Sequence, residues 1–197
     1  MIAQPENYPA RLEVDYPEQL NRITTLLRVI WIVPILVILV LLSGGEEGIA
    51  TGLAVATALM IVVRQRYPRW WFDFSRELTR FEGRLTAYLA LLTDQFPSTV
   101  EEQSVHIEID YPDVEGDLNR WLPLVKWLLA IPHYIVLVVL GLLAVIAVIV
   151  AWFAILITGR FPRGLFDFVV GVLRWALRVQ AYAFLLVTDR YPPFRLS

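Results

Sequence analysis

The chain has 197 residues and a formal net charge of −2, and 57% of its residues are hydrophobic, above the roughly 45–50% of an ordinary soluble domain. Charged residues make up 18%, and this near-neutral balance argues against a nucleic-acid binder, which usually carries a basic face. Cysteine is absent, which excludes a disulfide framework and thiolate chemistry. The apolar residues gather in runs, as expected for an integral membrane protein whose backbone polar groups must be satisfied within helices.

One unit of about a hundred residues occurs twice along the chain. The matching segments, in the same order, are Glu13–Pro17 with Glu108–Pro112, Arg66–Arg69 with Arg160–Arg163, Phe72–Phe74 with Phe166–Phe168, and Thr93–Pro97 with Thr188–Pro192. Such self-similarity predicts a tandem duplication, with a first repeat over 1–98 and a second over 99–197. We expect an all-α membrane protein in which each repeat consists of a short surface strand, a transmembrane helical hairpin and an interfacial amphipathic helix.

Each repeat opens with a short segment in which apolar and polar residues alternate, at 11–16 and at 105–110. Alternation with a period of two that ends near a proline is typical of a short, half-buried strand. A single strand needs a partner, and the two repeats supply one each. We therefore expect these strands to pair on the membrane surface, either within one chain or between chains.

The apolar runs predict a membrane hairpin in each repeat, over 26–63 and 124–157. A glycine-rich charged loop at 43–48 joins the helices of the first hairpin, whereas about four residues are missing at the equivalent place in the second, which predicts a tight turn at Gly141-Leu142. An interior proline, Pro34 or Pro132, is expected to kink the leading helix of each hairpin. Helices of about fifteen residues reach only ~22 Å against a hydrocarbon core of ~30 Å, so full crossing and a shallow hairpin both remain open.

Basic residues set the expected orientation, because Lys and Arg accumulate on the cytoplasmic side of membrane helices. They flank both hairpins, while the 43–48 loop has none. The sequence therefore predicts a multi-pass protein of the bacterial inner (plasma) membrane, with both termini and the middle linker cytoplasmic. The acidic start of the chain does not have the basic region of a cleaved signal peptide.

The last part of each repeat is predicted to be an amphipathic helix, over 70–92 and 164–187. Its polar positions recur at helical spacing, at Asp73, Glu77, Arg80, Arg84 and Tyr88 and at Asp167, Gly171, Arg174, Arg178 and Tyr182. A helix of this kind lies in the membrane interface. The candidate lipid-headgroup-binding residues are Arg66, Arg80, Arg84, Tyr88, Arg160, Arg174, Arg178 and Tyr182, because guanidinium groups match phosphate oxygens. Structural pairing, such as Glu77 with Arg80, is the competing interpretation.

Motifs that would carry chemistry are missing from the sequence. It has no phosphate-cradling glycine loop, no spaced set of metal ligands and no nucleophile elbow, so we expect no catalytic residue, no metal and no cofactor. Asp73 and Asp167 fall at helix starts, where a carboxylate favours the positive helix end. His106 and His133 are isolated, and a packing role is expected for His133.

The segments Asp110-Tyr111-Pro112 and Phe166-Asp167-Phe168, and the ending Thr188–Phe194, resemble a bacterial membrane family known as domain of unknown function 4389. The first repeat departs from the pattern at its end, where Phe96-Pro97-Ser98 replaces Tyr-Pro-Pro. The resemblance implies a bacterial membrane protein without an established activity, and it offers no catalytic residues to transfer.

These observations favour a non-enzymatic integral membrane protein that acts by assembly with membrane lipids, as a homo-oligomer that organises lipid or as an accessory subunit of a larger membrane complex. The alternative is a small channel or lipid-translocating transporter, because duplicated units with broken helices are common among transporters. In that case the repeats would be parallel, since both are expected in one orientation. An enzyme acting on lipids ranks last.

Overall fold

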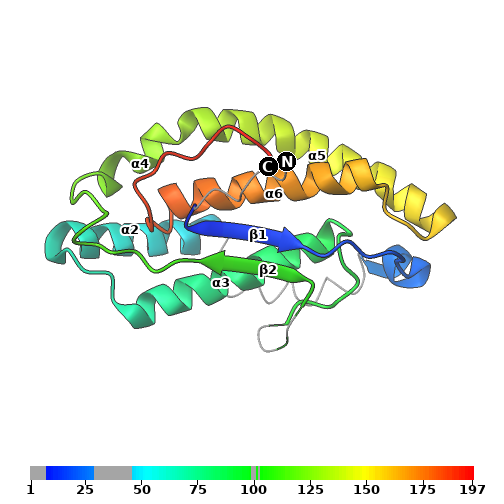
Figure 1. The fold of residues 1–197 in the computed structure, drawn as a ribbon, viewed down its shortest axis with the longest axis horizontal. Helices are drawn as coiled ribbons and strands as arrows, with labels where there is room; N and C mark the ends of the chain where they lie inside the picture. The colour runs from blue at the N-terminus through cyan, green and yellow to red at the C-terminus, as the bar shows by residue number, and fades with distance from the viewer. Residues whose placement is uncertain (1–7, 29–45, 99–100, 102) are drawn as a thin grey trace, which may run out of the picture.

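The computed structural model describes residues 8–28, 46–98, 101 and 103–197. Its elements are β1 (Ala10–Val14), α2 (Glu46–Arg64), α3 (Arg69–Leu89), β2 (Val105–Ile109), α4 (Pro123–Leu129), α5 (Ile131–Thr158) and α6 (Arg163–Ala183), and residues 22–28 are also helical. The described chain is therefore mostly helical, with one small sheet. Figure 1 shows that α3, α5, α6 and both strands run along the same long direction of the molecule.

The sheet consists of β1 and β2 paired antiparallel, with Leu12 opposite Ile107. The strands predicted at 11–16 and 105–110 correspond to these elements, and they pair within one chain. Leu12 and Ile107 point into the core, whereas Glu13 and Glu108 are exposed, as the two-residue period of a strand requires. The outer face is charged, and the Arg11 guanidinium lies 3.2 Å from the Glu108 carboxylate.

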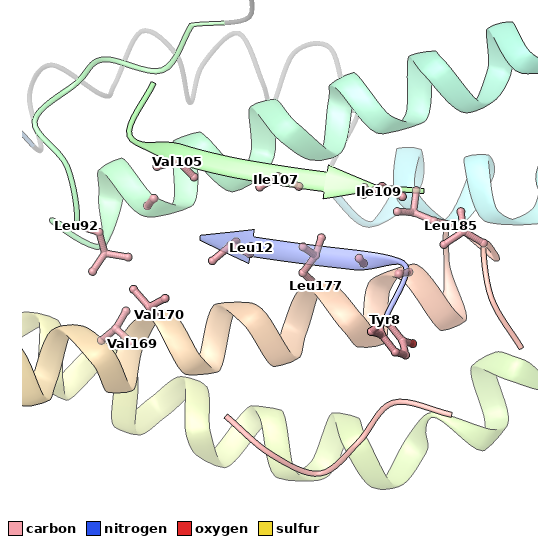
Figure 2. Packing of buried hydrophobic residues seen from close by; sticks show 14 of the residues in the cluster. Tyr8, Leu12, Leu92, Val105, Ile107, Ile109, Val169, Val170, Leu177 and Leu185 are labelled. Atoms are coloured by element: carbon pink, nitrogen blue, oxygen red, sulfur yellow. The ribbon is translucent and has the colours of Figure 1, made fainter. Parts of the chain in front are cut away.

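Each strand packs on the amphipathic helix of the other repeat. β1 lies against α6, and β2 lies against α3, so the spatial order is α5, α6, β1, β2, α3 (Figure 1). In Figure 2, Val170 and Leu177 of α6 lie on the side of that helix nearest β1 and its buried Leu12. The two repeats therefore share one hydrophobic core through exchanged strands.

The predicted hairpin over 124–157 is wrong, because α5 continues without a break through Gly141 and Leu142. A turn there would leave backbone N–H and C=O groups among apolar side chains, at several kcal/mol, whereas one glycine in a helix costs only about 1 kcal/mol. The chain breaks instead between α4 and α5, and Pro132 lies in the first turn of α5, where a proline is tolerated. It does not kink the interior of a membrane helix.

The hairpin predicted over 26–63 lies partly outside the described residues, since 29–45 are not among them. The end of its predicted loop, Glu46-Glu47-Gly48, forms the start of α2. The predicted interfacial helices at 70–92 and 164–187 correspond to α3 and α6.

α5 packs on α6 through small and aliphatic residues, with Ala147, Ala151 and Ile155 buried. Most of its remaining surface is apolar and exposed, at Ile135, Val138, Val139, Leu142, Leu143, Val145, Ile146, Ile149, Val150, Phe153 and Ile157. Among the described residues, α5 is the one helix long and apolar enough to cross a membrane, and the apolar Gly52–Arg64 part of α2 is shorter. The predicted multi-pass topology therefore has no support in the described part of the chain.

Candidate functional site

The arginines of the predicted headgroup stripe bind the edges of the sheet. Arg80 on α3 donates through Nε to the carbonyl of Ile107 over 2.9 Å, and the equivalent Arg174 on α6 donates through Nε to the carbonyl of Leu12, also over 2.9 Å. Leu12 and Ile107 face each other between the cross-strand hydrogen-bonded positions, so both carbonyls point away from the partner strand. The two arginines thus satisfy edge groups that would otherwise be open to further strand pairing.

The next pair of stripe arginines holds the segments that follow the helices. Arg84 donates to the carbonyl of Ser98 over 2.5 Å. Arg178 is buried and donates through Nη2 to the carbonyls of Arg195 and Ser197 over 2.7 and 3.0 Å. These bonds fasten each post-helix segment to its own amphipathic helix.

Tyr88 and Tyr182, the stripe tyrosines, are buried beside a basic side chain from the start of the apolar segment. The Arg28 guanidinium lies 4.2 Å from the centre of the Tyr88 ring, and the Lys126 ammonium lies 5.3 Å from that of Tyr182. Both contacts are cation–π interactions. Of the eight predicted headgroup residues, these two tyrosines together with Arg80, Arg84, Arg174 and Arg178 contact other parts of the chain, and a headgroup role for them stays a prediction.

Sequence reasoning missed two buried ion pairs that are equivalent in the two repeats. Arg28 pairs with Asp94, and Lys126 pairs with Asp189 at 2.7 Å. Burial lowers the pKa of Lys126, although the hydrogen bond and charge of Asp189 oppose this. The signal was available, because both acids belong to the repeated Thr-Asp motif and both bases recur at the 98-residue offset.

The same carboxylates fix the entry of each apolar segment. Asp94 accepts a hydrogen bond from the backbone N–H of Asn21 over 2.7 Å, and Asp189 accepts one from the backbone N–H of Asn119 over 2.5 Å. Each Thr-Asp motif therefore joins the end of its repeat to the beginning of that repeat's first apolar helix.

Arg66 and Arg160, the remaining predicted residues, lie in two clefts at opposite ends of the molecule, which we call the end clefts. The first has a volume of about 790 Å³ and lies between Met60–Arg69 and the 111–115 segment of the second repeat. The second, of about 370 Å³, lies between Thr158–Arg160 and the 19–22 segment of the first repeat. The 64–66 turn corresponds to 158–160, so the clefts are equivalent under the duplication.

The turns that form the end clefts are held by a tyrosine from the other repeat. Tyr111 donates its hydroxyl to the carbonyl of Tyr67 over 2.5 Å, and its ring lies 4.2 Å from the Arg69 guanidinium. Tyr16 makes the equivalent contacts next to the turn of the second cleft, donating to the carbonyl of Phe161 over 2.5 Å with Arg163 3.5 Å from its ring. This explains why the Asp-Tyr-Pro and Arg-Tyr/Phe-Pro-Arg motifs recur together.

An arginine from the other repeat also binds the helix end beside each cleft. Arg22 donates to the carbonyl of Ile157 over 3.1 Å, and Arg120 donates to the carbonyl of Val62 over 2.6 Å. Cations favour the negative carboxyl end of a helix. Arg22 lines the second cleft and Arg120 lies next to the first, and both guanidinium groups already bind protein acceptors.

Groups that could carry chemistry are not gathered at either cleft. No cluster of three or more His, Asp or Glu suited to a metal ion occurs in the residues that the structure describes. His133 is buried, accepts a hydrogen bond at Nδ1 from Trp175 Nε1 over 3.1 Å, and stacks on Phe194 at 4.0 Å. These contacts give it the packing role expected from the sequence.

The fold defines a class, a mostly helical protein made of two copies of one unit, whose described residues include one helix of membrane-crossing length. The chain belongs to the family described as domain of unknown function 4389, whose model matches residues 22–101 and again 121–195. The resemblance inferred from the repeated motifs is therefore confirmed, and both matches leave out the exchanged strands. A search of curated proteins and of solved structures finds no match.

Proposed function

We propose that this protein is a non-enzymatic membrane protein that embeds in one leaflet, with α5 lying in the plane of the bilayer surface, and that it organises lipid there. The observation that carries the proposal is that α5, with its exposed apolar surface, runs parallel to a sheet whose outer face is charged (Figure 1).

The direction of α5 relative to the sheet decides between lying in the membrane and crossing it. If α5 crossed, β1 and β2 would extend through the hydrocarbon beside it, with Glu13, Glu108 and Asp110 at depth. Each charged group at mid-depth costs at least about 2.5–3.5 kcal/mol. With α5 in the surface plane, the sheet lies parallel to the bilayer and its charged face remains in water.

The apolar surface of α5 is too extensive for a monomer in water. Leu142 is 64% exposed and Ile157 is 75% exposed, as parts of a continuous row of large aliphatic side chains. Burial of such surface yields about 25 cal/mol per Å², and contiguous patches of this kind mark membrane or protein interfaces. The match to lipid is supported by the absence of charged residues from the whole of α5.

Exposed aromatic residues support placement at the level of the headgroups. Trp121 and Trp127 are both exposed, and they belong to the segment before α4 and to α4 itself, which packs against α5. Tryptophan is enriched where a bilayer meets water, because its ring is apolar and its N–H is polar. These side chains fit an interface anchor beside the embedded helix.

A protein embedded on one side adds area to one leaflet only, and this asymmetry is the means by which we expect it to organise lipid. Reconstitution into liposomes tests the role by measuring vesicle size and lipid order. We expect both to change with protein content. No change in either, with the protein monomeric in detergent, would contradict the proposal. Robust ion flux or lipid scrambling would favour the channel or transporter alternative.

A further inference from the structure

The two end clefts carry guanidinium groups that have no hydrogen-bond or ion-pair partner among the described residues. Arg66 and Arg160 are exposed, and within the described residues neither side chain has a hydrogen bond or ion pair. Arg64, which also lines the first cleft, is likewise exposed, and its side chain has no hydrogen bond or ion pair within the described residues. A guanidinium fork matches the oxygens of a phosphate group in two parallel hydrogen bonds.

The clefts are built before any ligand arrives. Tyr111 and Tyr16 hold the turns that carry these arginines through 2.5 Å hydrogen bonds, and Arg22 and Arg120 bind the adjoining helix ends. Because the backbone frame is already formed, binding need order only the arginine side chains, which lowers the entropic cost of binding.

Apolar surface adjoins the charge in both clefts. Val63 is 65% exposed next to Arg64, and Ile157 is 75% exposed three residues before Arg160. Both residues stand at the carboxyl ends of the apolar helices α2 and α5. A ligand that carries a phosphate beside a hydrocarbon chain fits this arrangement better than a free phosphate does.

We propose that each end cleft binds the phosphate of one anionic phospholipid headgroup, with Arg66 and Arg160 as equivalent ligands, so that one chain holds two lipids at opposite ends. This assignment rests on the membrane embedding proposed above. The sites are unequal: Asp113 and Glu115 line the first cleft together with its three arginines. The described lining of the second contains Arg22 and Arg160 and no acid, so the second binds more tightly.

The test compares binding of the full-length protein to vesicles of phosphatidylcholine alone and to vesicles containing phosphatidylglycerol, at one salt concentration. The variants are R66Q, R160Q and the double variant. The control is R11Q/R76Q, which removes the same charge from arginines that already pair with Glu108, Asp110, Asp73 or Glu77. The double cleft variant is expected to lower the preference for anionic vesicles by about tenfold, with R160Q causing the larger share.

The outcomes separate this inference from the embedding on which it rests. If the wild-type protein did not bind neutral vesicles, the embedding itself would be overturned. If it bound them, but R11Q/R76Q lowered the preference for anionic vesicles as much as the double cleft variant does, the cleft assignment alone would be overturned. A second experiment adds inorganic phosphate. If phosphate displaced anionic vesicles, and raised the melting temperature of the wild type but not of R160Q, the ligand would be free phosphate and the lipid assignment would fail.

Discussion

The Lys126 ammonium and the Asp189 carboxylate lie 2.7 Å apart, with Lys126 completely buried. Lys126 also donates to the carbonyl of Thr188 over 2.8 Å. The pair connects α4 to the segment after α6. In the first repeat, the equivalent pair of Arg28 with Asp94 connects the helical residues 22–28 to the segment after α3. These are the places where the two ends of each repeat meet, so their removal tests how the fold is closed.

We expect Asp189→Asn to lower the free energy of unfolding by about 3 kcal/mol, because it leaves a buried ammonium without its counter-charge. The double variant K126M/D189N removes both charges and should cost less than D189N alone. Unfolding in mixed micelles, followed by circular dichroism, measures both. A double variant less stable than D189N would contradict the view that the unpaired charge causes the loss.

The lowered pKa of Lys126 predicts a dependence of stability on pH. Burial lowers this pKa in the folded protein below its usual 10.5, so between the two values the unfolded chain binds more protons. Stability contributed by this group should therefore rise with pH through that window and level off above it. The difference in unfolding free energy between the wild type and Lys126→Met measures it, and Lys126→Arg, which stays charged, should show no such rise.

The arginines that bind the sheet edges should act across the repeats. Arg174→Gln removes a charged donor from the carbonyl of Leu12, and Arg80→Gln removes one from that of Ile107, each at about 1.5–3 kcal/mol. Hydrogen exchange is expected to quicken in β1 for the first variant and in β2 for the second. If Arg174→Gln quickened hydrogen exchange only in β2, or Arg80→Gln only in β1, these cross-repeat contacts would be contradicted.

The turn after each apolar helix offers a matched pair of backbone substitutions. Gln65 has φ = 46° and its equivalent Gly159 has φ = 75°, and a left-handed conformation costs a side chain roughly 1–2 kcal/mol. Gln65→Gly should therefore raise the melting temperature, and Gly159→Ala should lower it. Calorimetry in detergent checks both, and a destabilised Gln65→Gly would show that the glutamine side chain compensates for the strain.

Much of the fold was predictable because the duplication doubles every signal. The alternation around Leu12 and Ile107 predicted both strands, and the helical spacing from Arg80 to Tyr88 predicted α3. Periodicity shows which residues share a face, but not which surface that face meets. The stripe of α6 therefore was assigned to headgroups, whereas Arg174 binds a strand that precedes it by 162 residues.

The continuity of α5 could not be inferred from the offset between the repeats. A deletion of about four residues fits both a shortened turn and a loop absorbed into a helix, and Gly141 fits either because nothing lies within 4 Å of its missing Cβ. The end clefts were equally hidden, since Arg66 and Tyr111 come to line one cleft only when each strand packs on the helix of the other repeat. The sequence did show that both motifs recur in the same order, with Tyr16 and Tyr111 95 residues apart and Arg66 and Arg160 94 residues apart.

The placement of α5 is tested most directly by measuring the depth of single labels along it. The chain has no cysteine, so Ile135→Cys, Leu142→Cys, Ile149→Cys and Ile157→Cys each give one exposed attachment site for a fluorophore quenched by lipids labelled at known depth. An in-plane helix, about 42 Å long, predicts one common depth, about 5–10 Å below the headgroups, at all four positions. Deep labels at Leu142 and Ile149, with Ile135 and Ile157 near opposite surfaces, would contradict the account.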